Sequence, residues 1–320
     1  MESISSTTVL RTANLSIGYA TDTAEQILFD EVNLSLPQGQ LTCFMGPNGI
    51  GKSTLIRVLA GLQKPLRGEV ARGEGKIALV LTDKITTTNM TVWDLVSYGR
   101  YPYLGWGISF DARDEQIIRQ SIDEVGILEL GASKVEELSD GQLQLAMIAR
   151  ALTQETPVLL LDEPTAHLDL NHRVEIMKLL HALARKKNKA VLVATHELDL
   201  ALQMADHIWL ATTGKKIKTG IPEDLVLDGS FDEIFRFKGF DLKSGKIQHE
   251  PFHAATVRLL GAGYAFLWTK NALERNGYVV SVDDGTHTIE VVEENNKLHW
   301  QFLQARFSTL QEVLAHLKSA

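Results

Sequence analysis

The stretch that decides the fold is GPNGIGKST, which runs from Gly46 to Thr54. It follows the apolar strand candidate QLTCFM and precedes LIRVLAG, whose apolar residues recur with helical spacing. A strand, a glycine-rich loop and a helix in this order form a P-loop, in which backbone N–H groups converge on phosphates and the positive end of the helix points at them. The sequence therefore predicts a nucleotide-phosphate site on an α/β sheet.

Individual side chains of this loop have distinct expected roles. Lys52 supplies a point charge to the β- and γ-phosphates, and the Ser53 hydroxyl is expected to ligate Mg²⁺, an oxygen-seeking cation. A glycine-rich turn without a ligand is the alternative, which the match at every fixed motif position disfavours. The other nucleotide-binding candidates of the loop are Gly46, Pro47, Asn48, Gly49, Gly51 and Thr54.

Two later apolar runs predict further buried strands, PVLLLDE at 157–163 and KAVLVATH at 189–196. Helical patterns alternate with them, such as RVEIMKLLHALA at 173–184, whose apolar residues form one face. Strands that alternate with helices in this way predict a parallel sheet covered on both faces.

Two acids end the first of these strands, at the edge where open α/β sheets bind ligands. Asp162 is expected to hold Mg²⁺, directly or through water, and Glu163 to orient or deprotonate the attacking water. A solvated strand end is the alternative, and the position after a P-loop decides against it. His196 ends the next strand and could reach the same γ-phosphate, although a satisfied polar residue is the more common role of such a histidine.

A second anion-site candidate is LSDGQ at 138–142, just ahead of the helical run LQLAMIARAL. A serine and a glycine at a helix N-terminus offer the Ser139 hydroxyl and the Gly141 N–H as donors, with Gln142 beside them. Taken without its context, an ordinary helix cap is the better interpretation of this segment.

Together these motifs resemble those of the ATPase subunits of ABC transporters, over about residues 8–235. The P-loop, the signature LSDGQ, the Walker B run LLLDEP, the D-loop AHLD at 166–169 and the switch histidine His196 stand in the order found in that family. The resemblance implies a P-loop NTPase core of the α/β class with a helical subdomain, ATP and Mg²⁺ as cofactors, and hydrolysis of the γ-phosphate. It also implies that Tyr19 stacks on adenine.

Two segments resemble the ATPases of importers for iron chelates, haem and cobalamin, TVWDLVSYGRYPYLGW at 91–106 and LDLNHRVEIMKLL at 168–180. The resemblance implies a nucleotide-sandwiched homodimer, because one chain carries one P-loop and one signature. It further implies integral membrane permease subunits that dock on the helical subdomain, a substrate-binding protein as an indirect partner, and a peripheral location on the cytoplasmic face of the membrane. Filling the core of a small subdomain is the alternative role for the aromatic residues of 91–106.

Two positions depart from the family pattern. Asp140 replaces the first glycine of LSGGQ and puts a carboxylate near an anion site. Because Ser139 and Gly141 remain, we expect a site with altered properties rather than an inactive one. Thr82, followed by Asp83, aligns with the glutamine of the Q-loop. A threonine hydroxyl can bind water or metal, so Thr82 joins Ser53 and Asp162 as a metal-site candidate, with a shorter reach than glutamine.

Composition excludes several other classes of protein. The 320 residues carry 32 Lys+Arg against 40 Asp+Glu, a net charge of −8, which argues against a nucleic-acid partner. The lone Cys43 excludes a disulfide framework, and no apolar run reaches the ~18–20 residues of a membrane span. The remaining rivals are a soluble ABC protein of translation or DNA repair, an exporter ATPase and a P-loop kinase; the kinase would leave the signature unexplained.

The domain limits follow from shifts in composition. We predict an ATPase domain at 1–235 with its helical subdomain at about 87–140, a polar linker at 236–251 and a small α+β accessory domain at 252–320. The accessory domain has the pattern β-α-β-β-β-α. No cluster of His, Cys or paired acids in it suggests catalysis, so the predicted role is regulatory or dimer-stabilising.

Three local features of the accessory domain are predicted. YVVSV and HTIEVVEE form a hairpin around Asp283-Asp284-Gly285, and the helix in FLWTKNALERNG ends at Gly277. Ser308 caps the closing helix with Gln311 or Glu312. The apolar helix residues expected against one sheet face are Phe266, Leu267, Leu273, Leu310, Val313, Leu314 and Leu317.

Overall fold

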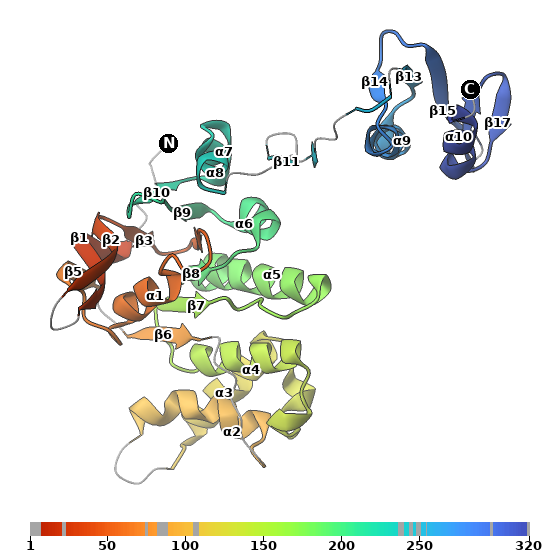
Figure 1. The fold of residues 1–320 in the computed structure, drawn as a ribbon. Helices are drawn as coiled ribbons and strands as arrows, with labels where there is room; N and C mark the ends of the chain where they lie inside the picture. The colour runs from red at the N-terminus through yellow and green to blue at the C-terminus, as the bar shows by residue number, and fades with distance from the viewer. Residues whose placement is uncertain are drawn as a thin grey trace, which may run out of the picture. The chain divides into compact units, whose positions relative to one another are not determined.

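The chain forms two compact units, Met1–Arg236 and Phe237–Ala320 (Figure 1). The computed structural model describes residues 8–20, 24–73, 76–81, 89–104, 109–235, 240–242, 246–247, 251–253, 255–294 and 297–318.

A six-stranded sheet is the frame of the first unit, in the order β10-β9-β4-β8-β7-β6. Five strands run parallel, and the edge strand β10 is antiparallel to β9. Every residue of β4, β7 and β8 is buried, which explains their continuous apolar sequences. The strands are β4 (Leu41–Met45), β6 (Ile77–Val80), β7 (Val158–Asp162), β8 (Ala190–Ala194), β9 (His207–Ala211) and β10 (Ile217–Gly220).

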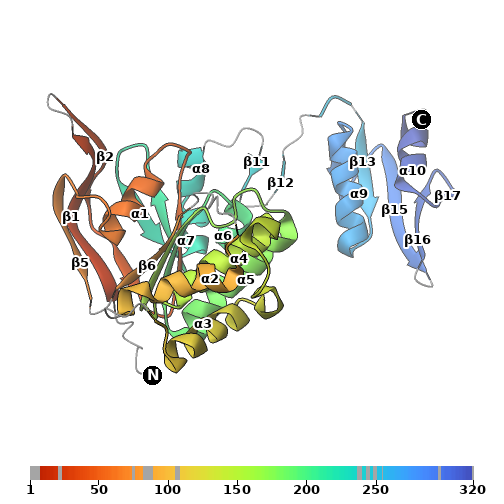
Figure 2. The ribbon, with the colours of Figure 1, turned by 90° about the horizontal axis from the view of Figure 1, so that it is seen from below.

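Helix α1 (Lys52–Ala60) packs between this sheet and a second, antiparallel one, because its apolar residues contact both (Figure 2). On the other face of the six-stranded sheet lie α5 (Leu170–Lys187) and α6 (Leu198–Met204). The predicted parallel sheet with helices on both faces is confirmed, although a β layer accompanies α1 on one side. That layer consists of β1 (Thr8–Ala20), β2 (Glu25–Val32), β3 (Ser35–Pro37) and β5 (Arg67–Arg72).

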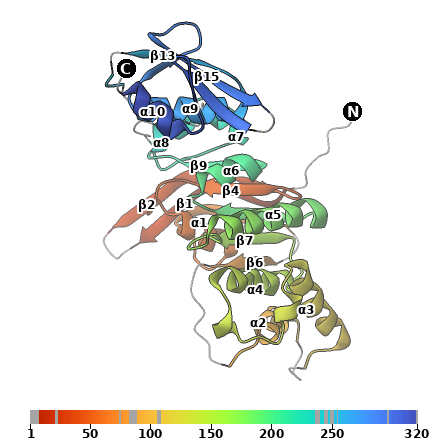
Figure 3. The same cartoon turned by 90° about the vertical axis from the view of Figure 1, so that its right-hand side faces the viewer.

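A helical subdomain lies beside the β6 edge of the sheet, where α4 contacts β6 (Figures 1 and 3). Its last helix begins inside the signature, one residue after Ser139. The elements are α2 (Val92–Ser97), η1 (Tyr98–Tyr103), α3 (Ala112–Glu124), η2 (Leu128–Leu130), η3 (Val135–Glu137) and α4 (Asp140–Leu152). The unit closes with α7 (Pro222–Leu227) and α8 (Ser230–Phe235).

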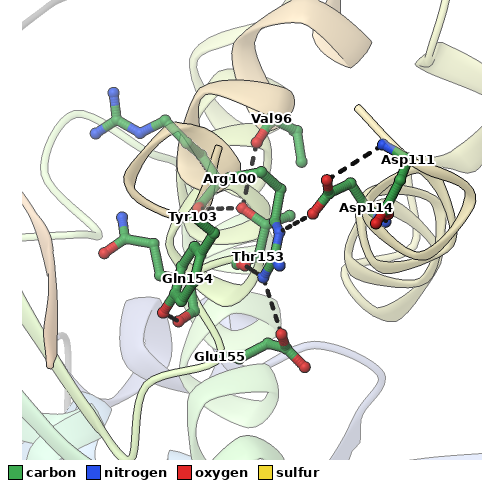
Figure 4. A network of polar contacts seen from close by, with 9 residues as sticks. Val96, Arg100, Tyr103, Asp111, Asp114, Thr153, Gln154 and Glu155 are labelled. Carbon is green, nitrogen blue, oxygen red and sulfur yellow. Dashed lines mark hydrogen bonds and ion pairs between the residues drawn. The ribbon is translucent and has the colours of Figure 1, made fainter. Parts of the chain in front are cut away.

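Buried Arg100 ties the subdomain to the segment that leads into β7 (Figure 4). Its Nε donates to Asp114 at 2.8 Å, and its Nη1 donates to the Thr153 carbonyl at 2.9 Å and to Glu155 at 2.8 Å. The guanidinium carbon lies 4.3 Å from the centroid of the Tyr103 ring. Arg100 therefore belongs to the core of the subdomain.

The tyrosines of the same segment stay at the surface. Tyr98, Tyr101 and Tyr103 are 40%, 47% and 43% exposed, so they do not fill the core of the subdomain. Of the described aromatic residues of this segment, these three tyrosines are therefore at the surface of the subdomain.

The second unit is a five-stranded sheet in the order β14-β13-β15-β16-β17, with one apolar core against α9 and α10. Its elements are β13 (Thr256–Leu260), α9 (Gly263–Arg275), β14 (Val279–Ser281), β15 (His287–Glu294), β16 (Lys297–Phe302), β17 (Ala305–Phe307) and α10 (Leu310–Leu317). A two-stranded ladder, β11 (Phe240–Asp241) with β12 (Lys246–Ile247), precedes it.

The predicted hairpin of YVVSV with HTIEVVEE is wrong. β14 and β15 both run parallel to β13 and lie on either side of it. The reason is burial: Val257 and Leu259 of β13 are fully buried, which requires a place between two other strands rather than at the edge of the sheet. Residues between β14 and β15 pass the start of β13, where the Thr286 N–H donates to the Thr256 carbonyl at 2.8 Å. The hairpin forms between β15 and β16 instead.

Smaller corrections concern the ends of the helices in this unit. The predicted stop of α9 is confirmed, since α9 ends at Arg275 with Asn276 as its C-cap and Gly277 follows with a φ of 83°. α10 is capped by Thr309, whose side chain accepts from Glu312 N, rather than by Ser308. β17 is one strand more than predicted. Leu267 is 38% exposed on α9 and lies outside the core that contains Leu273, Val313 and Leu317 and is flanked by Phe266, Leu310 and Leu314.

Candidate nucleotide site

The P-loop leaves β4 and enters α1 with a backbone that only glycine adopts readily. Gly49 and Gly51 have φ values of 77° and 113°, in the left-handed region. A Cβ at Gly49 would meet no described atom within 4 Å, so the loop faces open space there, and one at Gly51 would lie 3.0 Å from Leu28. No described side chain caps α1, which leaves the N–H groups of its first turn available to an anion.

Lys52 is buried at the base of the loop. Its Nζ donates to the carbonyls of Gly46 at 3.0 Å and Pro47 at 3.4 Å, and lies 4.0 Å from Glu163 Oε1. Burial lowers the pKa of Lys52, and the carboxylates of Glu163 and Asp162 partly oppose that shift. The Lys52 ammonium is thus held by two carbonyls of the loop, next to the acids that follow β7.

Ser53 and Asp162 meet at the carboxyl end of β7. The Ser53 hydroxyl donates to the Asp162 carboxylate, and this bond lowers the pKa of Asp162, whereas burial raises it by more. A hydroxyl beside a carboxylate is a donor set of oxygen atoms, the chemistry that Mg²⁺ prefers. These two predicted metal candidates are together; Thr82, the third, lies outside the described residues.

Glu163 and His196 face each other across the ends of neighbouring strands. Glu163 has a φ of 47°, a left-handed conformation that is uncommon outside glycine and is frequent at functional sites. Its N–H donates to the Ala194 carbonyl at 2.9 Å, which fixes it to β8. Glu163 Oε2 lies 3.6 Å from His196 Nδ1, so the two predicted catalytic side chains are within reach of a common ligand.

A single cavity of about 420 Å³ brings most of the predicted residues together. Tyr19 stands at its rim, 49% exposed, with its hydroxyl 2.9 Å from Thr54 Oγ1. Sequence reasoning missed Gln26 and Leu28 of β2; the only signal for them was their strand, in which Gln26 pairs with Tyr19. The lining is Tyr19, Gln26, Leu28, Asn48, Gly49, Gly51, Lys52, Ser53, Thr54, Glu163 and His196.

The signature residues do not line this cavity. Ser139 caps α4: its Oγ accepts from Gln142 N at 3.2 Å, and Gln142 Oε1 accepts from Ser139 N at 3.0 Å. Gly141 packs against His172 of α5, since a Cβ at Gly141 would lie 2.9 Å from the imidazole. Asp140 is exposed in the first turn of α4, where an acid favours the helix. Within one chain, the signature is a helix cap held against α5.

Comparison with known proteins agrees with this geometry. The sequence profile of ABC transporters matches residues 29–166, and that of the iron ABC transporter C-terminal domain matches residues 254–318. An uncharacterized ABC transporter ATP-binding protein of Methanocaldococcus jannaschii is 37% identical over 82% of this chain and 97% of its own length. The chain belongs to the ABC transporter ATP-binding family. Subunits of this family hydrolyse ATP, so the chain is an ATPase.

Two further ABC ATP-binding proteins are similar along most of their length. The petrobactin import ATP-binding protein of Bacillus anthracis is 36% identical over 72% of this chain and 87% of its own. The ferric enterobactin transport ATP-binding protein of Escherichia coli is 34% identical over 71% and 86%.

Solved ABC structures share the fold. An inward-facing transporter of the metal-chelate type has a TM-score of 0.67 at 22% identity, over 93% of this chain and 97% of its own. An ABC cassette in its ADP conformation has a TM-score of 0.63 at 25% identity, over 72% of this chain and all of its own. Among the described residues, no helix of this ABC subunit is long and apolar enough to cross a bilayer.

Proposed function

We propose that the chain is the ATP-hydrolysing subunit of an importer for a metal chelate of the ferric siderophore, haem or cobalamin type. The observation that carries the proposal is the match of residues 254–318 to the iron ABC transporter C-terminal domain. The named relatives support it, since they serve petrobactin and ferric enterobactin transport. A cobalamin import ATP-binding protein of Halobacterium salinarum is also 31% identical, over 80% of this chain and 69% of its own.

The site residues divide the work of hydrolysis between binding and proton transfer. Lys52 and the N–H groups of the P-loop bind the phosphates, and Tyr19 contacts the adenine at the rim. Glu163 orients the attacking water and accepts its proton, and His196, 3.6 Å from that carboxylate, contacts the γ-phosphate. Ser53 and Asp162 would hold Mg²⁺, which neutralises charge on the phosphate oxygens when it is bound.

A second copy of the chain completes the site in this proposal. The solved cassettes that share the fold include a dimeric one. Ser139, Gly141 and Gln142 lie outside the cavity of their own chain, and their anion-binding geometry would serve the nucleotide of the partner copy. The pair then closes on ATP and opens after hydrolysis.

The surface for an integral membrane permease is the one that carries Tyr98, Tyr101 and Tyr103. Tyrosine is enriched in the cores of protein–protein interfaces. A second cavity of about 420 Å³, lined by Trp93, Arg119 and Leu128 among others, lies in the same subdomain. Docking there would place the subunit on the cytoplasmic face of the membrane, with a substrate-binding protein reached only through the permease.

Reconstitution with the co-purified permease tests the function. Proteoliposomes that contain the complex are supplied with ferric siderophores, haem or cobalamin, each with its binding protein, and ATP turnover and uptake are measured. One class of chelate should stimulate both, and a complex that carries Glu163→Gln should show neither. Transport out of the cell by the co-purified permease, or equal turnover with every chelate and with none, would contradict the proposal.

A further inference from the structure

Arg173, in the first turn of α5, joins two loops that end at the nucleotide cavity. Its Nε donates to the Leu168 carbonyl of the D-loop at 2.6 Å. Its Nη1 donates to the Glu197 carboxylate, at 2.8 Å from Oε1 and 2.9 Å from Oε2. The Arg173 and Glu197 side chains are 33% and 16% exposed, so water screens this ion pair less than it screens a surface pair.

Glu197 extends the link to the catalytic side chains. Its Oε1 lies 3.7 Å from His196 Nε2, and His196 Nδ1 lies 3.6 Å from Glu163 Oε2. The Glu197 N–H donates to Thr195 Oγ1 at 3.0 Å, and this bond fixes the backbone that carries His196. Polar side-chain atoms within 4 Å of one another therefore lead from Glu163 through His196 and Glu197 to Arg173, which donates to the D-loop.

We propose that Arg173 is a positioning residue that holds His196 and the D-loop in one fixed relation, through Glu197 and the Leu168 carbonyl. The inference rests on the proposed catalytic roles of Glu163 and His196. The planar guanidinium can donate in two directions at once, and a lysine ammonium in its place cannot keep both partners at these angles. Without Arg173, the partly buried Glu197 carboxylate is left to its other neighbour, the His196 ring.

The same helix provides a matched control. Arg185, near the C-terminal end of α5, pairs with Asp206, and neither residue lines the nucleotide cavity. Both arginines are thus α5 side chains that pair with an acid on a neighbouring loop. A loss of kcat that follows from removing any such ion pair should appear at both positions.

The test uses the full-length chain with Arg173→Gln, Arg173→Lys and Arg185→Gln, and measures kcat, KM for ATP and Tm. Arg173→Gln should lower kcat about tenfold and leave KM within about twofold, because misplacement of catalytic groups acts on the chemical step. Arg173→Lys should recover only part of that loss. Arg185→Gln should leave kcat unchanged and lower Tm by less than Arg173→Gln, because its ion pair is more exposed.

A double-mutant cycle with Glu197→Gln sharpens the test. Because both residues act through one contact, the double variant should lose no more kcat than Arg173→Gln alone. Equal kcat for Arg173→Gln and Arg185→Gln, or additive losses in the cycle, would overturn the inference, as would a joint fall of kcat and Tm at Arg173 alone. Glu163→Gln, measured alongside, separates failure of the proposed function from failure of this inference. If Glu163→Gln retains turnover, the catalytic assignment fails. If Glu163→Gln loses turnover but Arg173→Gln keeps the parental kcat, only the inference about Arg173 fails.

Discussion

The P-loop and the signature segment each stand at the start of a helix, yet the N–H groups of the two helix starts differ in what they contact. In the cavity, Gly49 faces open space and α1 begins with no described side-chain cap, so its donors are available. In the signature, Ser139 and Gln142 satisfy each other in a capping box. The cavity leaves the N–H groups of its helix open to a ligand, whereas the first turn of the signature helix carries a side-chain cap from its own chain.

One chain does not bring all of the predicted nucleotide-binding residues together. The cavity gathers Lys52, Glu163 and His196 but none of the signature residues. The signature helix instead contacts α5, where Gly141 packs against His172. His172 Nδ1 in turn lies 2.8 Å from the Asp169 carboxylate of the D-loop. We infer that the cavity binds the nucleotide and that the signature is required for the dimer to close on it.

The largest expected effect is at Glu163, on the cavity side of the comparison. Glu163→Gln should lower ATP turnover by roughly 10²–10⁴ and preserve ATP binding, because only the proton-accepting carboxylate is lost. Steady-state turnover and equilibrium nucleotide titration measure the two quantities. Glu175→Gln, an exposed residue of α5, is the control and should match the parent. Parental turnover in Glu163→Gln would show that another group activates the water.

The next effect concerns the stability of the subdomain that carries the signature. Arg100→Leu leaves Asp114 and Glu155 without their shared cation, and loss of one partner of a buried pair costs about 3–5 kcal/mol. Urea unfolding followed by circular dichroism should show that loss in the first unit. If Arg100→Leu unfolded with the parental midpoint, Arg100 would not be the tie between the subdomain and the β7 segment.

A smaller effect separates the two roles of Ser139. Ser139→Ala removes the cap and should cost about 1 kcal/mol, whereas Ser139→Asp keeps a capping oxygen and should retain parental stability. Both should bind ATP as the parent does, and Ser139→Asp should lose turnover because its carboxylate repels the γ-phosphate of the partner site. Thermal unfolding and turnover of the two variants provide the comparison. Full activity in Ser139→Asp would make the signature a helix cap and nothing more.

The smallest effect is a stability gain at Asp162. Burial raises the pKa of this carboxyl in the fold, so its contribution to stability is greatest at low pH and is lost as pH rises through the folded pKa. Asp162→Asn should therefore be the more stable protein at neutral pH, and the difference in stability should shrink toward pH 4. Unfolding without nucleotide or Mg²⁺ measures it. A parental pH profile in the variant would contradict the assignment of the burial cost to this carboxyl.

The sequence pattern predicted most of the cavity residues because they are grouped in a few short segments of the chain. GPNGIGKST and VLLLDE each fix a strand, a turn and the side chains at its end, and parallel pairing then brings Lys52, Asp162 and Glu163 to one sheet edge. Gln26 and Leu28 escaped because a strand partner of Tyr19 is decided by pairing rather than by sequence.

The accessory unit shows the same limit. Short strands with a turn between them looked like a hairpin, and the buried strand β13 took the central place instead. Arg173 gave no signal in the sequence either, since its partners Leu168 and Glu197 lie on loops whose meeting depends on the whole sheet. Contacts between loops and between non-adjacent strands are set by tertiary packing.

A truncated chain tests the role of the accessory unit. We predict that a chain ending near Gln248 folds, binds ATP and differs from the parent in dimerisation or basal turnover, because the second unit has its own apolar core. Circular dichroism, nucleotide titration and sedimentation measure the three properties. Unfolding of the ATPase unit on truncation would show that the two units share their stability.

A mixing experiment is the most direct test of the proposal that the signature of a second copy completes each nucleotide site. Lys52→Ala and Ser139→Asp are each expected to be inactive alone, the first because its cavity lacks the phosphate-binding cation and the second because its signature repels the partner's nucleotide. In an equal mixture, half of the dimers pair the two variants, and each of these keeps one intact site of two, so turnover should recover to about a quarter of the parental value. Turnover that stays at background on mixing, or that is complete in either variant alone, would contradict the account.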